Sequence, residues 1–302
     1  MLDLFGIILN VVLPTFLVIG TGAVLQRAFR FNLAELNRLA LYGAVPALVF
    51  KSLMREELNP EALLRLIGSQ LCFYPIMFLL ALAFSGLLKA KNEHKRGMIA
   101  TAMFPNSANI MLPVTLFAFG EAARDLAAIM FSFSSLMLFS LGPIVLSGGK
   151  GKLRSPLGVL KMPVIWAVIL GLTLNLNHIS LPQNLMRSIG ILADAAIPLV
   201  LLALGMQMYQ TGFSRPRALN ILSAAFKLLI GPILCFGIGY LLGLRALELK
   251  VFTLWGAMPP AINTFMLALE FEAGAEEVGK TVMLATASAF FTIALVLRFL
   301  QF

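Results

Sequence analysis

Ten apolar runs, each about the ~20 residues that a helix needs to cross a bilayer core, take up most of this chain. They fall at about 5–26, 34–53, 63–88, 97–119, 126–147, 157–176, 188–209, 219–243, 249–270 and 279–300. With 60% hydrophobic and only 12% charged residues, the chain carries more apolar surface than a water-soluble domain of this size can bury. We therefore predict an all-α membrane protein with ten transmembrane helices and no separate soluble domain.

The net charge of +9 comes from basic residues in short groups between the apolar runs. That distribution favours contact with the lipid bilayer, and we expect no nucleic-acid partner. The first run lacks the basic start of a cleavable signal peptide, so we interpret it as the first span. Cys72 and Cys235 have no histidine or carboxylate at ligand spacing, and we expect packing residues, without a metal site or a cofactor.

Lys and Arg are distributed unequally between the two sets of connections. Fourteen lie in the odd-numbered connections, and eight lie in the even-numbered connections and the C-terminal end. Most of the excess comes from the groups at 89–96 and 150–154, and Lys161 is also among the fourteen. The positive-inside rule then predicts a cell (inner) membrane protein with cytoplasmic odd-numbered connections and both termini outside the cytoplasm.

The sequence also contains a weak internal repeat. Four pairs of residues recur in order at offsets of 149 to 154 positions: Pro14 and Pro163, Pro46 and Pro198, Pro105 and Pro259, and Ser134 and Ser288. Each half would hold five spans, an odd number, so the second copy must enter the membrane from the opposite side. We predict two inverted five-helix repeats, 1–150 and 151–302, an arrangement typical of secondary transporters.

The fourth and ninth runs share the pattern Pro-x-x-x-Asn and each contains two prolines. Proline removes a backbone donor and clashes with the preceding turn, so we expect both helices to break and to cross near the midplane. Broken helix ends supply N–H groups and partial positive charge that suit an anionic substrate. Ordinary proline kinks are the alternative, but the duplicated pattern favours a site. The candidate substrate-binding residues are Pro105, Asn106, Asn109, Pro113, Pro259, Pro260, Asn263 and Thr264.

A few other polar residues lie within the runs. Asp194 is expected to be either a proton or cation carrier or a solvated, paired structural residue. Lys227 has three interpretations, as an attractor for the anion, as the partner of Asp194, or as a residue that snorkels to the cytoplasmic end, and we prefer the last. Ser134 and Ser288 either line the substrate pathway or pack between helices.

Four glutamates between positions 270 and 277 are predicted to be solvated loop charges. The sequence contains no nucleophile-elbow, phosphate-loop or zinc-protease motif. No nucleophile, base and orienting group can be assembled from residues inside the runs, so we expect no enzyme.

The chain resembles the auxin efflux carrier family of membrane transporters, and the similarity covers nearly its whole length. The motifs that carry it are Leu13-Pro14-Thr15-Phe16, Tyr42-x-x-x-Pro46-Ala47-Leu48, Phe104-Pro105-Asn106 with Leu112-Pro113-Val114, Ala196-Ile197-Pro198-Leu199, and Met258-Pro259 with Asn263. Plant members place a long hydrophilic loop where this chain has only residues 147–155, so it resembles a short microbial member.

The resemblance implies a fold akin to bile acid transporters and sodium/proton exchangers. A scaffold of about 1–55 and 156–212, which often forms a homodimer, would support a moving transport bundle of about 60–148 and 216–302. It also implies elevator-like alternating access, with the substrate held where broken helices 4 and 9 cross. Motif matching assigns Pro105, Asn106 and Pro259 to that crossing.

We therefore expect a transporter for a small organic anion, a carboxylate such as malate, malonate or an auxin-like acid. The sequence leaves open whether flux is driven by membrane potential alone or coupled to a proton or sodium ion. The alternatives are a sodium-coupled symporter resembling the bile acid carriers and a membrane sensor of the same fold that binds the ligand without moving it.

Overall fold

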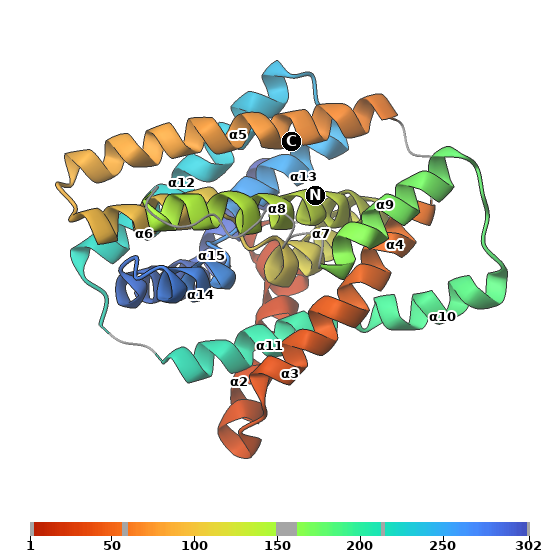
Figure 1. Ribbon diagram of the computed structural model, residues 1–302, viewed down its shortest axis with the longest axis horizontal. Coiled ribbons are helices and arrows are strands. Elements are labelled where there is room, and N and C mark those ends of the chain that lie inside the picture. The colour runs from red at the N-terminus through yellow and green to blue at the C-terminus, as the bar shows by residue number, and fades with distance from the viewer. Residues whose placement is uncertain (1–2, 56–59, 149–161, 213–214, 301–302) are drawn as a thin grey trace.

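The computed structural model describes residues 3–55, 60–148, 162–212 and 215–300, and this part of the chain is almost wholly helical (Figure 1). It contains one isolated β-bridge and no β-strand within these ranges. The helices, with η marking π-helical turns, are α1 (Leu4–Ile7), η1 (Ile8–Val12), α2 (Leu13–Phe29), α3 (Leu33–Leu39), η2 (Ala40–Ala44), α4 (Val45–Arg55), α5 (Pro60–Leu87), α6 (Asn92–Met103), η3 (Ser107–Met111), α7 (Leu112–Phe119), α8 (Glu121–Ser147), α9 (Pro163–Leu176), α10 (Gln183–Asp194), α11 (Ala196–Thr211), α12 (Ala218–Leu241), α13 (Ala246–Ala257), α14 (Ile262–Glu270) and α15 (Ala275–Leu300).

Seven helical segments of the described residues are long and apolar enough to cross a membrane. They are Leu4–Phe29, Leu33–Met54, Leu63–Leu87, Glu121–Ser147, Gln183–Thr211, Ala218–Leu241 and Ala275–Leu300. Two of the other three apolar runs, 97–119 and 249–270, are each divided into two shorter helices. The third, 157–176, is helical from Pro163, and the residues before Met162 lie outside the described ranges.

Proline explains a recurring irregularity within the long helices. Each π-helical turn ends two residues before a proline, at Pro14, Pro46 and Pro113. Proline offers no N–H to the carbonyl four residues earlier and its ring clashes there. That carbonyl belongs to the middle residue of each π-turn, where the wider backbone makes room for the ring. The helices therefore continue through these prolines.

Two groups of helices are visible in Figure 1. Helices α2, α3, α4, α9, α10 and α11 occupy the lower and right-hand parts of the view, and α5, α6, α8 and α12–α15 occupy the upper and left-hand parts. Within the first group, α2 packs most closely on α11. A Cβ atom built on Gly22 would lie 2.3 Å from the Leu202 carbonyl oxygen, and one on Gly205 would lie 1.8 Å from that of Ile19. Only glycine permits this backbone contact, a common device between membrane helices.

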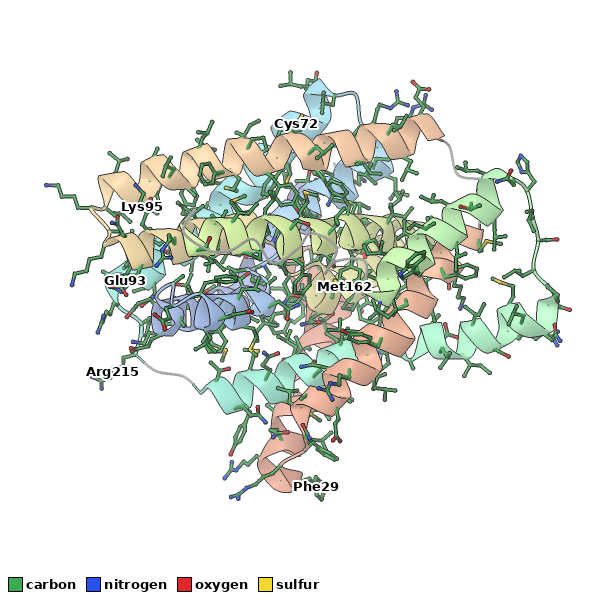
Figure 2. All side chains as sticks on the ribbon, viewed as in Figure 1. Phe29, Cys72, Glu93, Lys95, Met162 and Arg215 are labelled. Carbon is green, nitrogen blue, oxygen red and sulfur yellow. The ribbon has the colours of Figure 1, made fainter. Side chains whose placement is uncertain are left out.

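Large apolar side chains cover the outside of both groups. Leu87, Ile191 and Leu241 are each at least 75% exposed. Such surface suits contact with lipid tails and would be costly in water. Lys95 and Arg215, from the third and seventh predicted connections, lie at the same end of the molecule in Figure 2. The basic residues Lys150, Lys152, Arg154 and Lys161, which also entered the topology prediction, lie outside the described residues.

The two divided segments meet at their breaks. Residues 104–106 separate α6 from η3, and residues 258–261 separate α13 from α14. The isolated β-bridge joins Pro105 to Pro260 in antiparallel orientation. The two extended stretches therefore cross directly against one another, inside a bundle of helices.

Backbone hydrogen bonds hold this crossing together. The Asn106 N–H donates to the Pro259 carbonyl at 2.7 Å, and the Ala261 N–H donates to the Phe104 carbonyl, also at 2.7 Å. A buried backbone group without a partner costs free energy comparable to a lost hydrogen bond, and no water is available in a bilayer core. Each stretch therefore satisfies the groups that the other helix break leaves open.

Candidate functional site

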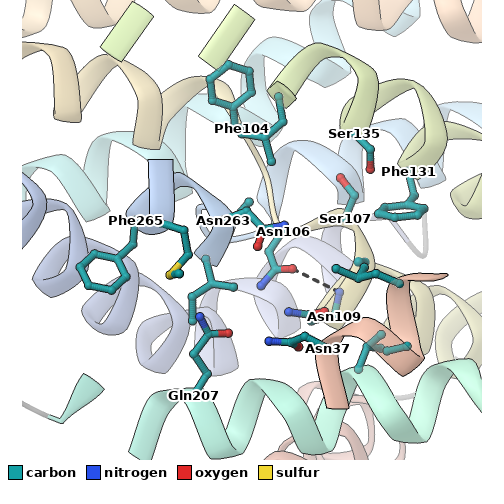
Figure 3. Close-up of a pocket in the computed structure, with 18 of the residues that line it drawn as sticks. Asn37, Phe104, Asn106, Ser107, Asn109, Phe131, Ser135, Gln207, Asn263 and Phe265 are labelled. Atoms are coloured by element: carbon teal, nitrogen blue, oxygen red, sulfur yellow. Dashed lines mark hydrogen bonds between the residues drawn. The ribbon is translucent and has the colours of Figure 1, made fainter. Parts of the chain in front are cut away.

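A cavity of about 700 Å³ lies against the crossing, bounded by residues of α3, η3, α8, α11 and α14. This volume is typical of small-molecule sites. None of the described residues that line it carries a formal charge. Its polar lining consists of hydroxyl groups and six side-chain amides, namely those of Asn37, Asn106, Asn109, Gln207, Gln210 and Asn263 (Figure 3).

Asn106 has the most informative surroundings of the six. Its side-chain oxygen accepts the N–H of Asn109 at 3.2 Å and so caps the start of η3. The residue is only 3% exposed, and its side-chain nitrogen has no hydrogen-bond partner among the described residues. Figure 3 shows the Asn106 amide between Asn109 and Asn263 at the cavity. A buried amide donor without a partner is unfavourable unless a ligand or water accepts from it.

The start of α14 adds backbone donors to the same wall. Its cap residue, Ala261, provides no side-chain hydrogen bond to the helix. Ile262 and Asn263, the first two residues of the helix, both line the cavity. The first N–H groups of a helix have no partner within it and carry the positive end of the helix dipole. This wall therefore offers an anion several donors and partial positive charge without a formal cation.

The rest of the lining is apolar. It includes Phe104, Phe131, Phe139, Phe265 and Met266. A ligand with one polar end and a compact apolar body would match the two kinds of wall.

A hydrogen-bonded cluster supports the polar wall from behind. Ser107 and Ser134 both line the cavity, and Trp255 Nε1 donates to their Oγ atoms at 2.8 Å and 3.1 Å. The Tyr74 hydroxyl lies 3.2 Å from Ser134 Oγ. Sequence analysis did not identify Tyr74 or Trp255, although Trp255 stands only four residues before Pro259.

The predicted substrate-binding residues divide into two sets. Pro105, Asn106, Asn109 and Asn263 line the cavity. Pro113, Pro259, Pro260 and Thr264 do not: Pro113 is buried in the first turn of α7, Pro259 and Pro260 form part of the crossing backbone, and Thr264 is fully buried in α14. Pro105 and the three amides form the surface of the wall, and the other prolines shape the backbone behind it.

Asn37, Gln207 and Gln210 were not predicted. They come from α3 and α11, far along the chain from the broken helices, and Figure 3 shows Gln207 directed from α11 toward the crossing. A single polar residue near a helix end is ordinary in sequence. Only the tertiary arrangement brings these amides to the cavity.

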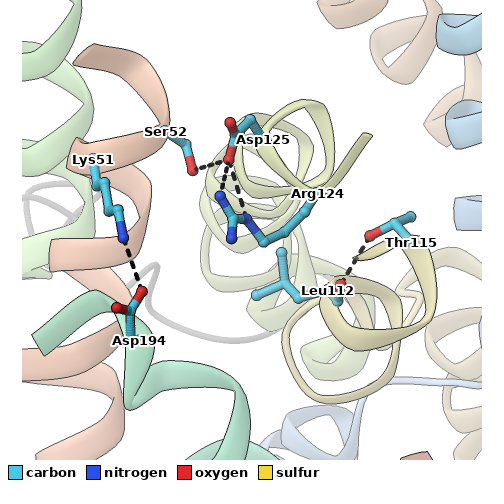
Figure 4. Close-up of polar contacts among 7 residues, drawn as sticks. All are labelled: Lys51, Ser52, Leu112, Thr115, Arg124, Asp125 and Asp194. Carbon is cyan, nitrogen blue, oxygen red and sulfur yellow. Dashed lines mark hydrogen bonds and ion pairs between the residues drawn. The ribbon is translucent and has the colours of Figure 1, made fainter. Parts of the chain in front are cut away.

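Asp194 fits one of its two predicted interpretations. Its carboxylate is 69% exposed and accepts from Lys51 Nζ at 2.8 Å (Figure 4), so it belongs to a partly solvated ion pair between α10 and α4. It neither lines the cavity nor pairs with Lys227. The paired structural interpretation therefore fits its position.

The preferred interpretation of Lys227 was wrong, because its side chain does not snorkel. The side chain is fully buried, with Nζ donating to the Gly256 carbonyl at 3.0 Å and lying 5.6 Å from the centre of the Phe73 ring. Gly231 and Gly256 bring the α12 and α13 backbones into contact, and this places the ammonium beside the C-terminal end of α13. The negative end of that helix dipole compensates part of the charge. Lys227 does not line the cavity.

The glutamate cluster is also only partly as predicted. Glu277 is buried and pairs with Arg217 at 2.9 Å and with Lys280 at 3.6 Å, so it is not a solvated loop charge. Ser288, the repeat counterpart of Ser134, lies on α15 and does not line the cavity.

A buried ionic contact on another side of the molecule was missed. Asp125 Oδ1 accepts from Arg124 Nη2 at 2.9 Å and from Ser52 Oγ at 2.7 Å (Figure 4). Ser52 belongs to α4, and the other two belong to α8. The sequence placed both charges in a connection, because the apolar run begins only after them.

Comparisons with known proteins find similarity to membrane transporters. A family model described as "Membrane transport protein" matches residues 152–297. An "Uncharacterized transporter" of Methanothermobacter thermautotrophicus is 30% identical, covering 84% of each chain. A "Putative malonate transporter" of Rhizobium meliloti is 26% identical over 92% of this chain and 91% of its own. "Auxin efflux carrier component 3a" of rice, Oryza sativa subsp. japonica, is 28% identical over 37% of this chain and 19% of its own. The length and identity of these matches, together with the all-helical membrane architecture, show that the chain belongs to the auxin efflux carrier family of membrane transport proteins.

Proposed function

We propose that this protein moves a small organic anion, a carboxylate such as malonate, malate or an auxin-like acid, across the cell membrane by elevator-like alternating access. The proposal includes ten spans arranged as two inverted five-helix repeats, with the interrupted segments as the fourth and ninth. The name of the Rhizobium relative supports malonate as one carboxylate to test.

The unpartnered amide nitrogen of Asn106 is the observation that carries the proposal. It points to a ligand that accepts hydrogen bonds, at a place where the start of α14 offers further donors. A carboxylate can accept several hydrogen bonds at once, and charge-assisted hydrogen bonds are roughly twice as strong as neutral ones.

The shape of the cavity supports an inward-facing state. Its lining reaches Leu33 and Ala34 in the first turn of α3, and Gln210 and Thr211 in the last turn of α11. These helix ends adjoin the first and seventh connections, which the charge distribution predicts to be cytoplasmic. The cavity lies between the proposed scaffold, which supplies α3 and α11, and the proposed transport bundle, which contains the whole crossing. A sliding movement of that bundle would carry the anion with it.

The uncharged lining also bears on the driving force. Among the described residues, no lining carboxylate is available to carry a proton or hold a sodium ion, and no lining cation neutralises a bound anion. The anion would then cross with its charge, so we propose electrogenic transport driven by membrane potential. This favours a uniporter over a sodium-coupled symporter.

Purified protein in liposomes tests the proposal. Saturable currents and uptake would be measured for malonate, malate and indole-3-acetate under separate proton, sodium and voltage gradients. We expect current with at least one of them, and at least a tenfold fall in transport efficiency for Asn109→Ala/Asn263→Ala, because a hydrogen bond to a charged group contributes about 1.5–3 kcal/mol.

Asn177→Ala serves as the matched control, because Asn177 is exposed at the end of α9 and its side chain donates to the Thr173 carbonyl of the same helix. It should transport as the unmodified protein does. Binding of the three anions without flux under any gradient would favour the sensor. Folded protein with neither binding nor flux would rule out this substrate class.

A further inference from the structure

The two serines at the polar wall are joined in one hydrogen-bonded cluster. Ser107 comes from η3 and Ser134 from α8, and Ser107 Oγ lies at donating distance from Ser134 Oγ, 3.2 Å, and from the Pro105 carbonyl, also 3.2 Å. The Trp255 indole contacts both serine oxygens and the Tyr74 hydroxyl contacts Ser134. The cluster therefore connects α5, η3, α8 and α13 at the surface of the cavity.

The supporting aromatic side chains are firmly held. Trp255 is fully buried and Tyr74 is 3% exposed. The Phe73 ring packs edge-to-face on Trp255 at 4.7 Å and on Tyr74 at 5.7 Å between centroids. Neither polar group of these two residues can reach solvent or turn to another partner without disturbing this packing.

The direction of the hydrogen bonds follows from what each group can donate. An indole N–H only donates, so both serine oxygens act as acceptors toward Trp255. The Tyr74 hydroxyl is buried and Ser134 Oγ is its sole hydrogen-bond partner among the described residues, so its hydrogen is satisfied by donation to Ser134. Ser107 in turn donates to Ser134 or to Pro105.

The hydrogen of Ser134 is left over from this arrangement. With Ser107 as the donor toward Ser134 Oγ, the Ser134 oxygen accepts from its neighbours and its own O–H has no hydrogen bond to a described residue. Because Ser134 lines the same cavity as Asn106, the free O–H can be directed to a ligand there. We infer that Ser134 donates a hydrogen bond to the transported anion, and that Tyr74 and Trp255 are positioning residues that fix this direction.

This inference rests on the proposed function and makes it more specific. With Ser134, the Asn106 amide nitrogen and the start of α14, the wall presents donors to the ligand. Such a wall binds a deprotonated carboxylate, whereas a protonated acid or a carboxamide would direct a hydrogen toward another donor. Malonamide, the uncharged analogue of malonate, should therefore compete at least tenfold more weakly than malonate.

A double-mutant cycle on the transport KM tests the positioning role. For the anion that the unmodified protein takes up, malonate or malate, Ser134→Ala should raise the KM about tenfold, as expected for one lost charge-assisted hydrogen bond. Tyr74→Phe keeps the ring and should raise the KM about three- to tenfold. In the Ser134→Ala background, Tyr74→Phe should add less than a twofold change, because Tyr74 acts through Ser134.

Two controls separate positioning from packing. Tyr240→Phe removes a hydroxyl from an exposed tyrosine and should leave the KM unchanged. Ser134→Thr keeps the hydroxyl and should restore most of the affinity that Ser134→Ala loses. A purely structural cluster would give lower unfolding temperatures with unchanged KM values.

Trp255 also supplies a binding signal that does not depend on flux. The chain has two tryptophans, so Trp166→Phe leaves Trp255 as the single emitter. Binding of the same anion should shift the emission of Trp255. The Kd values measured in this way should rank the variants in the same order as their KM values. Equal KM values across the cycle, or an undiminished Tyr74→Phe effect in the Ser134→Ala background, would overturn the inference about Ser134. The proposed function would still stand. If the unmodified protein neither binds nor transports malonate or malate, the proposed function fails and this inference fails with it.

Discussion

At the scale of single residues, buried polar groups near the crossing differ in whether the protein itself satisfies them. Lys227 donates to the Gly256 carbonyl and lies beside the negative end of α13, so its charge has local compensation. The Asn106 amide nitrogen has no such partner. The Lys227 ammonium therefore contributes to stability, and the Asn106 amide nitrogen is available for a ligand.

Charge reversal at Lys227 tests this division. Lys227→Glu would place a carboxylate against a carbonyl oxygen at the end of a helix, and we expect it to lose roughly 3–5 kcal/mol of stability. Lys227→Gln keeps a donor and should remain monodisperse. Thermal unfolding in detergent, followed by size-exclusion fluorescence, provides the measurement, and equal midpoints for the two variants would contradict the expectation.

The same scale shows how far the site can be predicted from sequence. Asn106, Asn109 and Asn263 were found because proline patterns mark the breaks beside them. Asn37 and Gln207 were missed because their segments carry no local signal and reach the cavity only through the packing of α3 and α11. The burial of Lys227 was also not predicted, because it depends on which helix packs against α12.

At the scale of helices, apolar runs and prolines predicted most of the observed elements. The interruptions at 104–106 and 258–261 fall where proline pairs indicate them. The π-helical turns before Pro14, Pro46 and Pro113 were not predicted, because a proline in sequence does not reveal whether its helix stops, kinks or widens. The close contacts at Gly22 and Gly205 were not predicted either, because the sequence does not reveal which helices pack against each other.

The contact between α2 and α11 gives a prediction with an internal control. Gly22→Ala would place a methyl group against the Leu202 carbonyl and should destabilise the protein by about 1–3 kcal/mol, because the backbones must separate. Gly20→Ala, two residues earlier on the same helix, meets nothing within 4 Å and should be neutral or slightly stabilising. Unfolding temperatures of the two variants, measured side by side, should differ clearly, and similar values would show that the contact can relax.

At the scale of the whole molecule, the cavity adjoins connections that the charge distribution predicts to be cytoplasmic. The cavity lies near the ends of α3 and α11, and the basic residues Lys95 and Arg215 mark the end of the molecule that we predict to be cytoplasmic. A bundle that holds the crossing could then release an anion on that side. The amino-acid sequence predicts this orientation through charge alone, but it does not reveal which conformation the protein adopts.

Cysteine labelling tests the orientation directly. In a Cys72→Ala background, Arg245→Cys should react with a membrane-impermeant maleimide added to intact cells. Arg215→Cys should react only after lysis, because the seventh connection is predicted to be cytoplasmic and the eighth external. Both arginine side chains are exposed, so the side of the membrane on which each cysteine lies determines whether it reacts. The reverse labelling pattern would invert the proposed topology.

The pairing at the crossing also determines when the protein can be completed during its synthesis. Pro260 leaves the ribosome 155 residues after Pro105, an interval of roughly 8 to 30 s at synthesis rates of ~5–20 residues per second. Until then the Phe104 carbonyl and the Asn106 N–H lack the partners that they have in the finished structure. Lipid cannot replace those partners. In the nascent first half, residues 104–106 must therefore stay hydrated or be shielded by the insertion machinery. Arrival of the second half is thus the event that allows the first half to settle fully in the bilayer.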